Sequence, residues 1–145
     1  MISLNQLVPI LQLATGPVIL ISGVGLLLLS FTNRLGRLID RARSLFRESL
    51  STTDEAHAVR VHRQIALIDR RAEILRWVIT LAAVAVLLVA VLILVLFTSA
   101  LFKLELGGLI VALFALSLIA LIGAMVGFIS EINLSLQAVR IETRP

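Results

Sequence analysis

Three long runs of the sequence contain no charged side chain. They cover residues 1–33, 77–102 and 106–130. A helix crosses the hydrocarbon core of a bilayer with about 20 mainly apolar residues, so each run is long enough for one crossing. The pattern therefore predicts an all-α membrane protein with three transmembrane helices.

The first run is interrupted by Pro9 and by Gly16-Pro17. Proline kinks or ends a helix unless it stands in the first turn. We therefore expect spans at about residues 16–33, 77–102 and 106–130. Residues 2–15 would then lie in the membrane interface or re-enter the membrane, and the sequence leaves both alternatives open. A secretory signal peptide fits poorly, since no basic residue precedes the apolar run.

From Phe31 to Arg76 the sequence carries a helical pattern of another kind. Apolar residues recur at alternating steps of three and four on both sides of a polar turn, and this spacing defines two heptad seams. The seams are Phe31, Leu35, Leu38, Ala42 and Leu45, then Ala58, Val61, Ile65, Ile68, Ala72 and Leu75. Thr52 and Glu55 have the spacing of a capping box that would start the second helix. We expect an antiparallel helical hairpin whose second arm continues directly into the second span.

The basic residues predict the orientation in the membrane. Ten of the 13 are arginines between Arg34 and Arg76. By the positive-inside rule this hairpin is cytoplasmic, the N-terminus is outside, and the tail 131–145 is cytoplasmic. Anionic lipid headgroups account for the basic excess, so we expect membrane lipids and no nucleic acid as partners.

The composition argues against catalysis. The chain has 145 residues, of which 59% are hydrophobic and 15% charged, and it contains no cysteine or tyrosine. His57 and His62 are five residues apart, about 140° around a helix, which is not the spacing of a metal-binding pair. Glu131, with Asn133 and Gln137, forms either a site or a polar face at the headgroup level. We expect no enzyme, no metal and no cofactor.

The polar side chains of the first helix gather on one side. At about 100° of rotation per residue almost all of them fall within an arc roughly 100° wide, with Thr32 as the exception. We name this face the polar arc. Its polar members are Gln12, Thr15, Ser22, Ser30, Asn33 and Arg37, and two apolar residues, Ile19 and Leu26, lie in its middle. In lipid a polar face turns towards protein or water. The polar arc therefore either packs against the other spans or lines a pore, with Asn33 and Arg37 at its cytoplasmic mouth.

The third span carries small residues on one face. Gly123 and Gly127 are four residues apart, a spacing that lets another helix approach closely. Packing within the chain and dimerisation both need such a contact, and we favour packing within the chain.

The segments from Gln6 to Gly25, Asn33 to Arg37 and Asp40 to Arg43 together resemble a family of short bacterial membrane proteins that is catalogued as a domain of unknown function. The resemblance implies a bacterial inner membrane and supplies no ligand or activity. The family assigns no role to Arg34, Asp40 and Arg41, so we select them by their charge and position alone. They would pair between helices or bind lipid phosphates near the membrane surface.

Two functions fit these features. The leading one is a homo-oligomeric membrane assembly whose polar arc forms a channel for ions or small solutes, because one chain is too small to enclose a path. Ile19 and Leu26 would close such a channel by dewetting. The alternative is a non-conducting scaffold or regulatory subunit that binds an unidentified protein partner through the cytoplasmic hairpin, since the heptad seams offer interaction surface.

Overall fold

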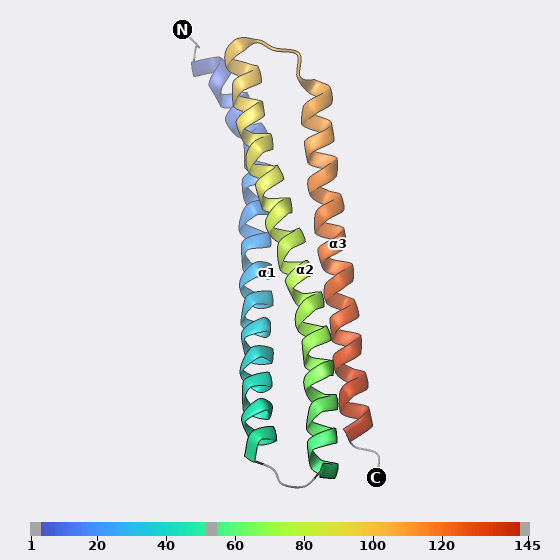
Figure 1. Ribbon diagram of the computed structural model, residues 1–145. Helices are drawn as coiled ribbons and strands as arrows, with labels where there is room; N and C mark the ends of the chain where they lie inside the picture. The colour runs from blue at the N-terminus through green and yellow to red at the C-terminus, as the bar shows by residue number, and fades with distance from the viewer. Residues whose placement is uncertain (1–3, 52–54, 143–145) are drawn as a thin grey trace. The chain divides into compact units, whose positions relative to one another are not determined.

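The computed structural model describes residues 4–51 and 55–142 (Figure 1). It contains three helices, and among the described residues there is no strand. The helices are α1 (Leu4–Ser51), α2 (Glu55–Phe102) and α3 (Gly107–Glu142). Each is long and apolar enough to cross a membrane. The predicted all-α fold with three membrane-spanning helices is confirmed at this level.

All three helices extend beyond the expected spans. α1 continues through Pro9 and Pro17, so the residues before the first expected span are helical from Leu4 onward. α2 runs for 48 residues without interruption, about 70 Å, because no Gly or Pro interrupts its sequence. α3 remains helical well past residue 130, as far as Glu142. Thr52, the expected helix cap, lies outside the described residues.

The chain divides into two compact units, which the three helices share. Unit 1 comprises Met1–Leu29 and Thr80–Gly123, and unit 2 comprises Ser30–Ile79 and Ala124–Pro145. In unit 1 the buried side chains are mostly small, which lets helices approach closely. They are Ala14, Val24, Ala82, Ala85, Val89, Leu92 and Ser117. Ser117 Oγ donates a hydrogen bond to the carbonyl oxygen of Phe114 at 2.7 Å, so its burial leaves the hydroxyl satisfied.

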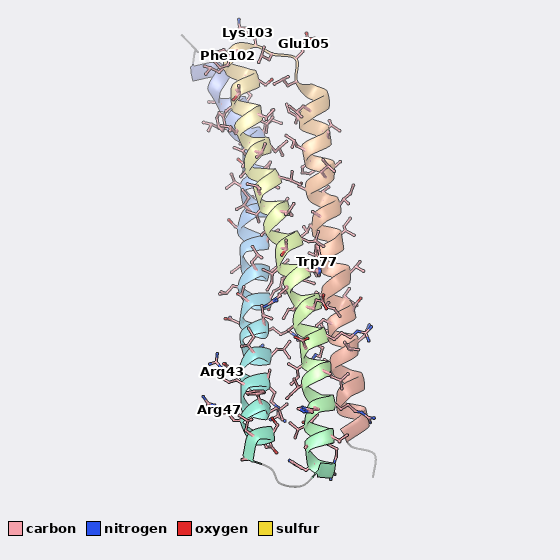
Figure 2. All side chains as sticks on the ribbon, viewed as in Figure 1. Arg43, Arg47, Trp77, Phe102, Lys103 and Glu105 are labelled. Atoms are coloured by element: carbon pink, nitrogen blue, oxygen red, sulfur yellow. The ribbon has the colours of Figure 1, made fainter. Side chains whose placement is uncertain are left out.

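The connection between α2 and α3 belongs to unit 1 and is a tight C-terminal cap (Figure 2). Lys103 adopts a left-handed conformation with φ of 51°. The amide of Leu104 then donates to the carbonyl oxygen of Ser99 at 3.0 Å, and Ser99 Oγ donates to the carbonyl oxygen of Leu104 at 2.6 Å. This is the pattern of a Schellman cap, in which glycine is the usual left-handed residue.

Unit 2 has a core of larger side chains. One cluster of buried residues contains Leu38 and Leu45 from α1 and Val61, Ile68 and Leu75 from α2. All five are positions of the two heptad seams, so the seam spacing identifies the faces by which these two helices pack. Phe128 of α3 packs against the same cluster, a contribution that the seams do not indicate.

The charged side chains of unit 2 lie mainly on its surface. Arg43 and Arg47 of α1 are exposed and point away from α2 (Figure 2). His57 Nε2 of α2 lies 3.0 Å from Glu48 Oε1 of α1, which links the two helices close to the end of α1. Among the described residues, the exceptions to this surface position are Glu131 of α3, which is buried, and Arg34 and Arg71, which are only partly exposed.

Candidate functional site

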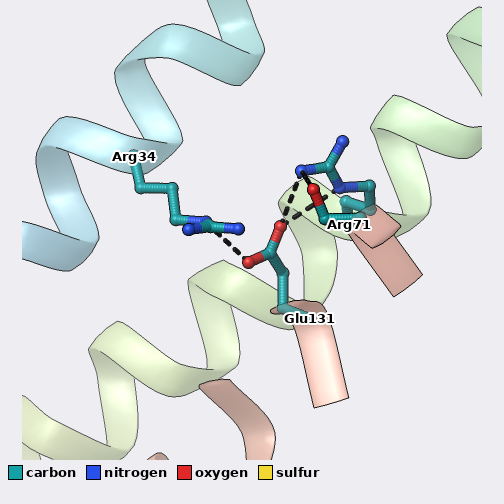
Figure 3. Close-up of polar contacts among 4 residues, drawn as sticks. Arg34, Arg71 and Glu131 are labelled. Carbon is teal, nitrogen blue, oxygen red and sulfur yellow. Dashed lines mark hydrogen bonds and ion pairs between the residues drawn. The ribbon is translucent and has the colours of Figure 1, made fainter. Parts of the chain in front are cut away.

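A glutamate buried among three helices is the centre of the polar structure in unit 2. Glu131 of α3 is 0% exposed, and arginines of α1 and α2 point towards it (Figure 3). Arg71 donates two hydrogen bonds to Glu131 Oε1, from Nε at 3.1 Å and from Nη2 at 2.9 Å. Its Nη2 also donates to Ser135 Oγ at 3.0 Å. Arg34 Nε lies 2.7 Å from Glu131 Oε2. We name these three charged residues the Arg34–Arg71–Glu131 cluster.

The two arginines hold the carboxylate in different ways. Arg71 makes directed, charge-assisted hydrogen bonds, which are the stronger kind. Arg34 forms an ion pair at close distance whose geometry is not that of a hydrogen bond, since neither Arg34 Nε nor Glu131 Oε2 has a hydrogen-bond partner. The carboxylate is therefore anchored chiefly to α2 and attracts α1 electrostatically.

Aromatic rings lie beside the cluster. The ring centroids of Phe31 and Phe128 are 4.6 Å apart with planes tilted by 44°, and the Arg34 guanidinium carbon lies 5.6 Å from the Phe128 centroid. Phe31 precedes Arg34 by three residues and Phe128 precedes Glu131 by three, so ring and charge lie on the same side of each helix. Phe128 supports Arg34 through a cation–π contact, and Phe31 packs against the Phe128 ring.

The polar arc is exposed along its whole length. Ile19 and Leu26 at its centre are 66% and 70% exposed. Its other members are exposed too: Gln12, Thr15, Ser22, Ser30, Asn33 and Arg37. In unit 1 the buried residues of α1 are Ala14 and Val24. They lie about 280° and 200° around the helix from Ser22, outside the arc. The polar arc is thus not a contact face between the helices of the chain.

Two hydroxyls of the polar arc are satisfied by their own helix. Thr15 Oγ1 donates to the carbonyl oxygen of Leu11 at 3.0 Å, and Ser22 Oγ donates to that of Val18 at 3.3 Å. Such bonds lower the cost of a hydroxyl in an apolar environment. A surface that covers the arc therefore does not have to supply hydrogen-bond partners for these groups.

The other candidate residues near the expected membrane surface lie in different environments. Arg34 is drawn into the cluster, whereas Arg37, Asp40 and Arg41 are exposed. Arg34 pairs with a residue of another helix, Glu131 of α3. The sequence leaves Glu131 open between a site and a headgroup-level polar face. The sequence feature that could have identified Glu131 as a site residue is its position as the first charged residue after the third apolar run.

Gly123 and Gly127 of α3 each lie close to α2, within unit 1 and unit 2 respectively. In unit 2, a Cβ on Gly127 would lie 2.8 Å from Val78 Cγ2; in unit 1, a Cβ on Gly123 would lie 3.4 Å from Leu81 Cδ1. Real Cβ atoms essentially never come as close as 2.8 Å, so α2 occupies the space that only a glycine at position 127 leaves. These contacts are made within the chain.

Unit 2 also carries a groove of about 610 Å³ between its α1 and α2 segments. Its lining contains both apolar and charged side chains. The apolar part of the lining includes Leu35, Ile39, Ala42, Ile65, Ala66 and Ala72, and the polar part includes His62, Asp69, Glu73 and Arg76. The groove does not include the residues of the Arg34–Arg71–Glu131 cluster.

One family model matches nearly the whole chain. Its description is Protein of unknown function (DUF2721), and the match covers residues 14–141. The matched segment includes all three members of the cluster and confirms the resemblance to a domain of unknown function. Neither a curated protein nor a solved structure matches the chain.

Proposed function

The chain belongs to the DUF2721 family, and we propose that it forms a homo-oligomeric membrane assembly in which the polar arc of α1 lines a path for ions or small solutes. The observation that carries this proposal is the exposure of the polar arc. In a bilayer a polar face turns towards protein or water. Because no other helix covers it among the residues that the structure describes, further copies or a water-filled path have to do so.

The same proposal includes an orientation. The arginine-rich helical hairpin at 34–76 lies in the cytoplasm beneath a bacterial inner membrane, with the N-terminus outside and the C-terminus inside. The polar arc then has Asn33 and Arg37 at its cytoplasmic end. Ile19 and Leu26 would form apolar rings inside the membrane, and rings of this kind close a path by excluding water.

Solute flux into liposomes tests this function. Leu26→Ser would make an apolar ring wettable, so flux should rise above that of the unchanged protein. Leu94→Ser is the matched control, because Leu94 of α2 is 66% exposed and lies outside the polar arc. Flux should stay unchanged in this control. Liposomes that remain impermeable at high protein density with both the original protein and Leu26→Ser would contradict the proposal.

The assembly itself can be tested separately. The chain has no cysteine, so one introduced at position 22 is unique. A bifunctional thiol reagent should cross-link Ser22→Cys into oligomers, whereas Leu94→Cys should yield mainly monomers. Particle mass in nanodiscs should correspond to several copies. A particle of one chain would exclude a path lined by several α1 helices.

The groove favours a second candidate, a non-conducting scaffold that binds a protein partner through the hairpin. Ile39 lines the groove and is 44% exposed, so Ile39→Asp alters the groove while leaving the buried cluster intact. Ser44→Asp adds the same charge elsewhere on the exposed surface of α1. A partner captured by the original protein and by Ser44→Asp, but not by Ile39→Asp, would support the scaffold.

A further inference from the structure

The Arg34–Arg71–Glu131 cluster has more positive than negative charge. Two guanidinium groups share one carboxylate, and among the described residues neither arginine forms an ion pair with a second acid. The side chains of Arg34 and Arg71 are only 28% and 16% exposed. A cation that is mostly withdrawn from water is unfavourable without a counter-charge. The cluster therefore has one positive charge left for an anion.

Both arginines also have donors to spare. In the described part of the chain, the Nη nitrogens of Arg34 and the Nη1 of Arg71 make no hydrogen bond. A guanidinium group has five N–H donors in a planar fork, and this fork matches the oxygens of a phosphate. The remaining exposure of both side chains leaves the cluster open to a ligand from outside.

The cluster lies where the uncharged runs end. Arg34 is the first charged residue of α1, and Glu131 is the first of α3. Arg71 precedes Trp77 by six residues, about 9 Å along α2. Tryptophan is typical of the headgroup layer, and Trp77 is 64% exposed. If the three runs cross the bilayer, the cluster is at the level of the lipid phosphates.

We propose that Arg34 and Arg71 together bind the phosphate group of an anionic lipid headgroup, while Glu131 holds the two guanidinium groups in position. A single chain supplies all three residues, so the site does not depend on oligomerisation or conduction. The chemistry requires a phosphate oxyanion that carries net negative charge, as in phosphatidylglycerol. A zwitterionic headgroup does not supply the missing charge.

The fluorescence of Trp77 can measure this preference, because it is the chain's single tryptophan. The protein is reconstituted in brominated phosphatidylcholine, whose bromine atoms quench tryptophan, and unbrominated phosphatidylglycerol is added in steps. Preferential binding of phosphatidylglycerol beside the cluster should restore fluorescence earlier than the bulk lipid ratio predicts. The same titration with unbrominated phosphatidylcholine supplies the reference.

The preference of each variant for phosphatidylglycerol should follow the net charge of its cluster. Arg34→Gln removes the surplus charge and should lower the preference for phosphatidylglycerol about fivefold, the factor that one cation near a membrane surface contributes. Glu131→Gln doubles the surplus and should raise the preference. The double variant Arg34→Gln/Glu131→Gln restores a surplus of one and should resemble the original protein. Arg43→Gln removes an exposed arginine elsewhere on α1 and should have no effect.

The expected ranking of the variants by lipid preference distinguishes lipid binding from a purely structural role of the cluster. If the cluster only stabilised the fold, Glu131→Gln would weaken the lipid preference rather than strengthen it. Circular dichroism verifies that each variant is helical, and the double variant avoids a buried carboxylate that has lost a partner. Equal effects of Arg34→Gln and Arg43→Gln, or no preference in the original protein, would overturn the proposal.

Inorganic phosphate distinguishes the two sources of the anion. Added at constant ionic strength, it should leave the phosphatidylglycerol titration unchanged, because the lipid is supplied at high local concentration in the bilayer. If inorganic phosphate abolished the preference, the site would bind soluble phosphate and the lipid assignment would be wrong.

Discussion

Arg34 Nε lies 2.7 Å from Oε2 of Glu131, and these are the first charged residues of α1 and α3. Each follows an uncharged run that is long enough to cross a bilayer. In unit 2 the charge that ends one run therefore neutralises the charge that ends another. The ion pair joins two helices at the point where both uncharged runs end.

The two arginines should differ in their contribution to stability. Arg71→Gln removes three charge-assisted hydrogen bonds from a mostly buried group and should cost about 3 kcal/mol. Arg34→Gln removes one ion pair of a more exposed side chain and should cost about 1 kcal/mol. Unfolding in detergent, followed by circular dichroism, measures both. Arg43→Gln should change the free energy of unfolding by less than about 0.5 kcal/mol. Equal costs for the two cluster arginines would contradict the asymmetry of their contacts.

Gly127 should tolerate no side chain while Val78 keeps its size. The Cβ of Gly127→Ala would lie 2.8 Å from Val78 Cγ2, so the helices have to move, at a cost of about 1–3 kcal/mol. Val78→Ala in the same chain should recover part of this loss. The matched control is Gly25→Ala, since a Cβ there has nothing within 4 Å. It should stabilise α1 by about 0.5–1 kcal/mol. An equal gain from Gly127→Ala would show that the two helices are not in contact.

Lys103 should be replaceable by glycine with a gain in stability. Its φ of 51° is left-handed, a conformation that costs a side chain with a Cβ about 1 kcal/mol. Lys103→Gly removes this strain and should raise the free energy of unfolding by roughly 0.5–1 kcal/mol. Lys103→Gln removes the same charge but retains the strain, and it should give no gain. If both variants had the same effect, the charge rather than the backbone would be responsible.

Phe128 should be coupled energetically to Arg34. Phe128→Leu keeps an apolar side chain but removes both the ring pair with Phe31 and the contact with the guanidinium, at a cost of about 1–2 kcal/mol. In a double-mutant cycle with Arg34→Gln, the combined loss should be smaller than the sum by about 0.5–1 kcal/mol. Additive losses would mean that the ring does not interact with the cation. Phe114→Leu, a change at a 43% exposed ring of the same helix, is the control.

Periodicity accounts for much of the fold. The seam positions Leu38, Leu45, Val61, Ile68 and Leu75 form the core cluster of unit 2, because side chains at steps of three and four share one face of a helix and two such faces exclude water when they pack. The uncharged runs likewise predict three membrane-spanning helices. Both features depend on local spacing, which a sequence displays directly.

The ends of the helices follow less directly from the sequence. Pro9 and Gly16-Pro17 left the start of the first helix open, and the structure continues α1 through them. A proline leaves a backbone carbonyl without its helical donor, and membrane helices tolerate this because neighbouring groups and small local changes of helix geometry satisfy that carbonyl. The extension of α3 beyond residue 130 is also not evident from local spacing; in unit 2, Glu131 and Ser135 in this extension accept hydrogen bonds from Arg71 of α2.

The sequence by itself determined that the chain is helical, apolar in three runs, and organised around two seams. Only the tertiary structure decided that the polar arc is exposed and that Glu131 is buried between two arginines. The physical reason is that the position of a polar side chain depends on its neighbours. A carboxylate stays in the core only if distant segments bring cations to it, and a polar face stays exposed only if other helices pack elsewhere. Those neighbours are far apart in the chain, so no local pattern reveals them.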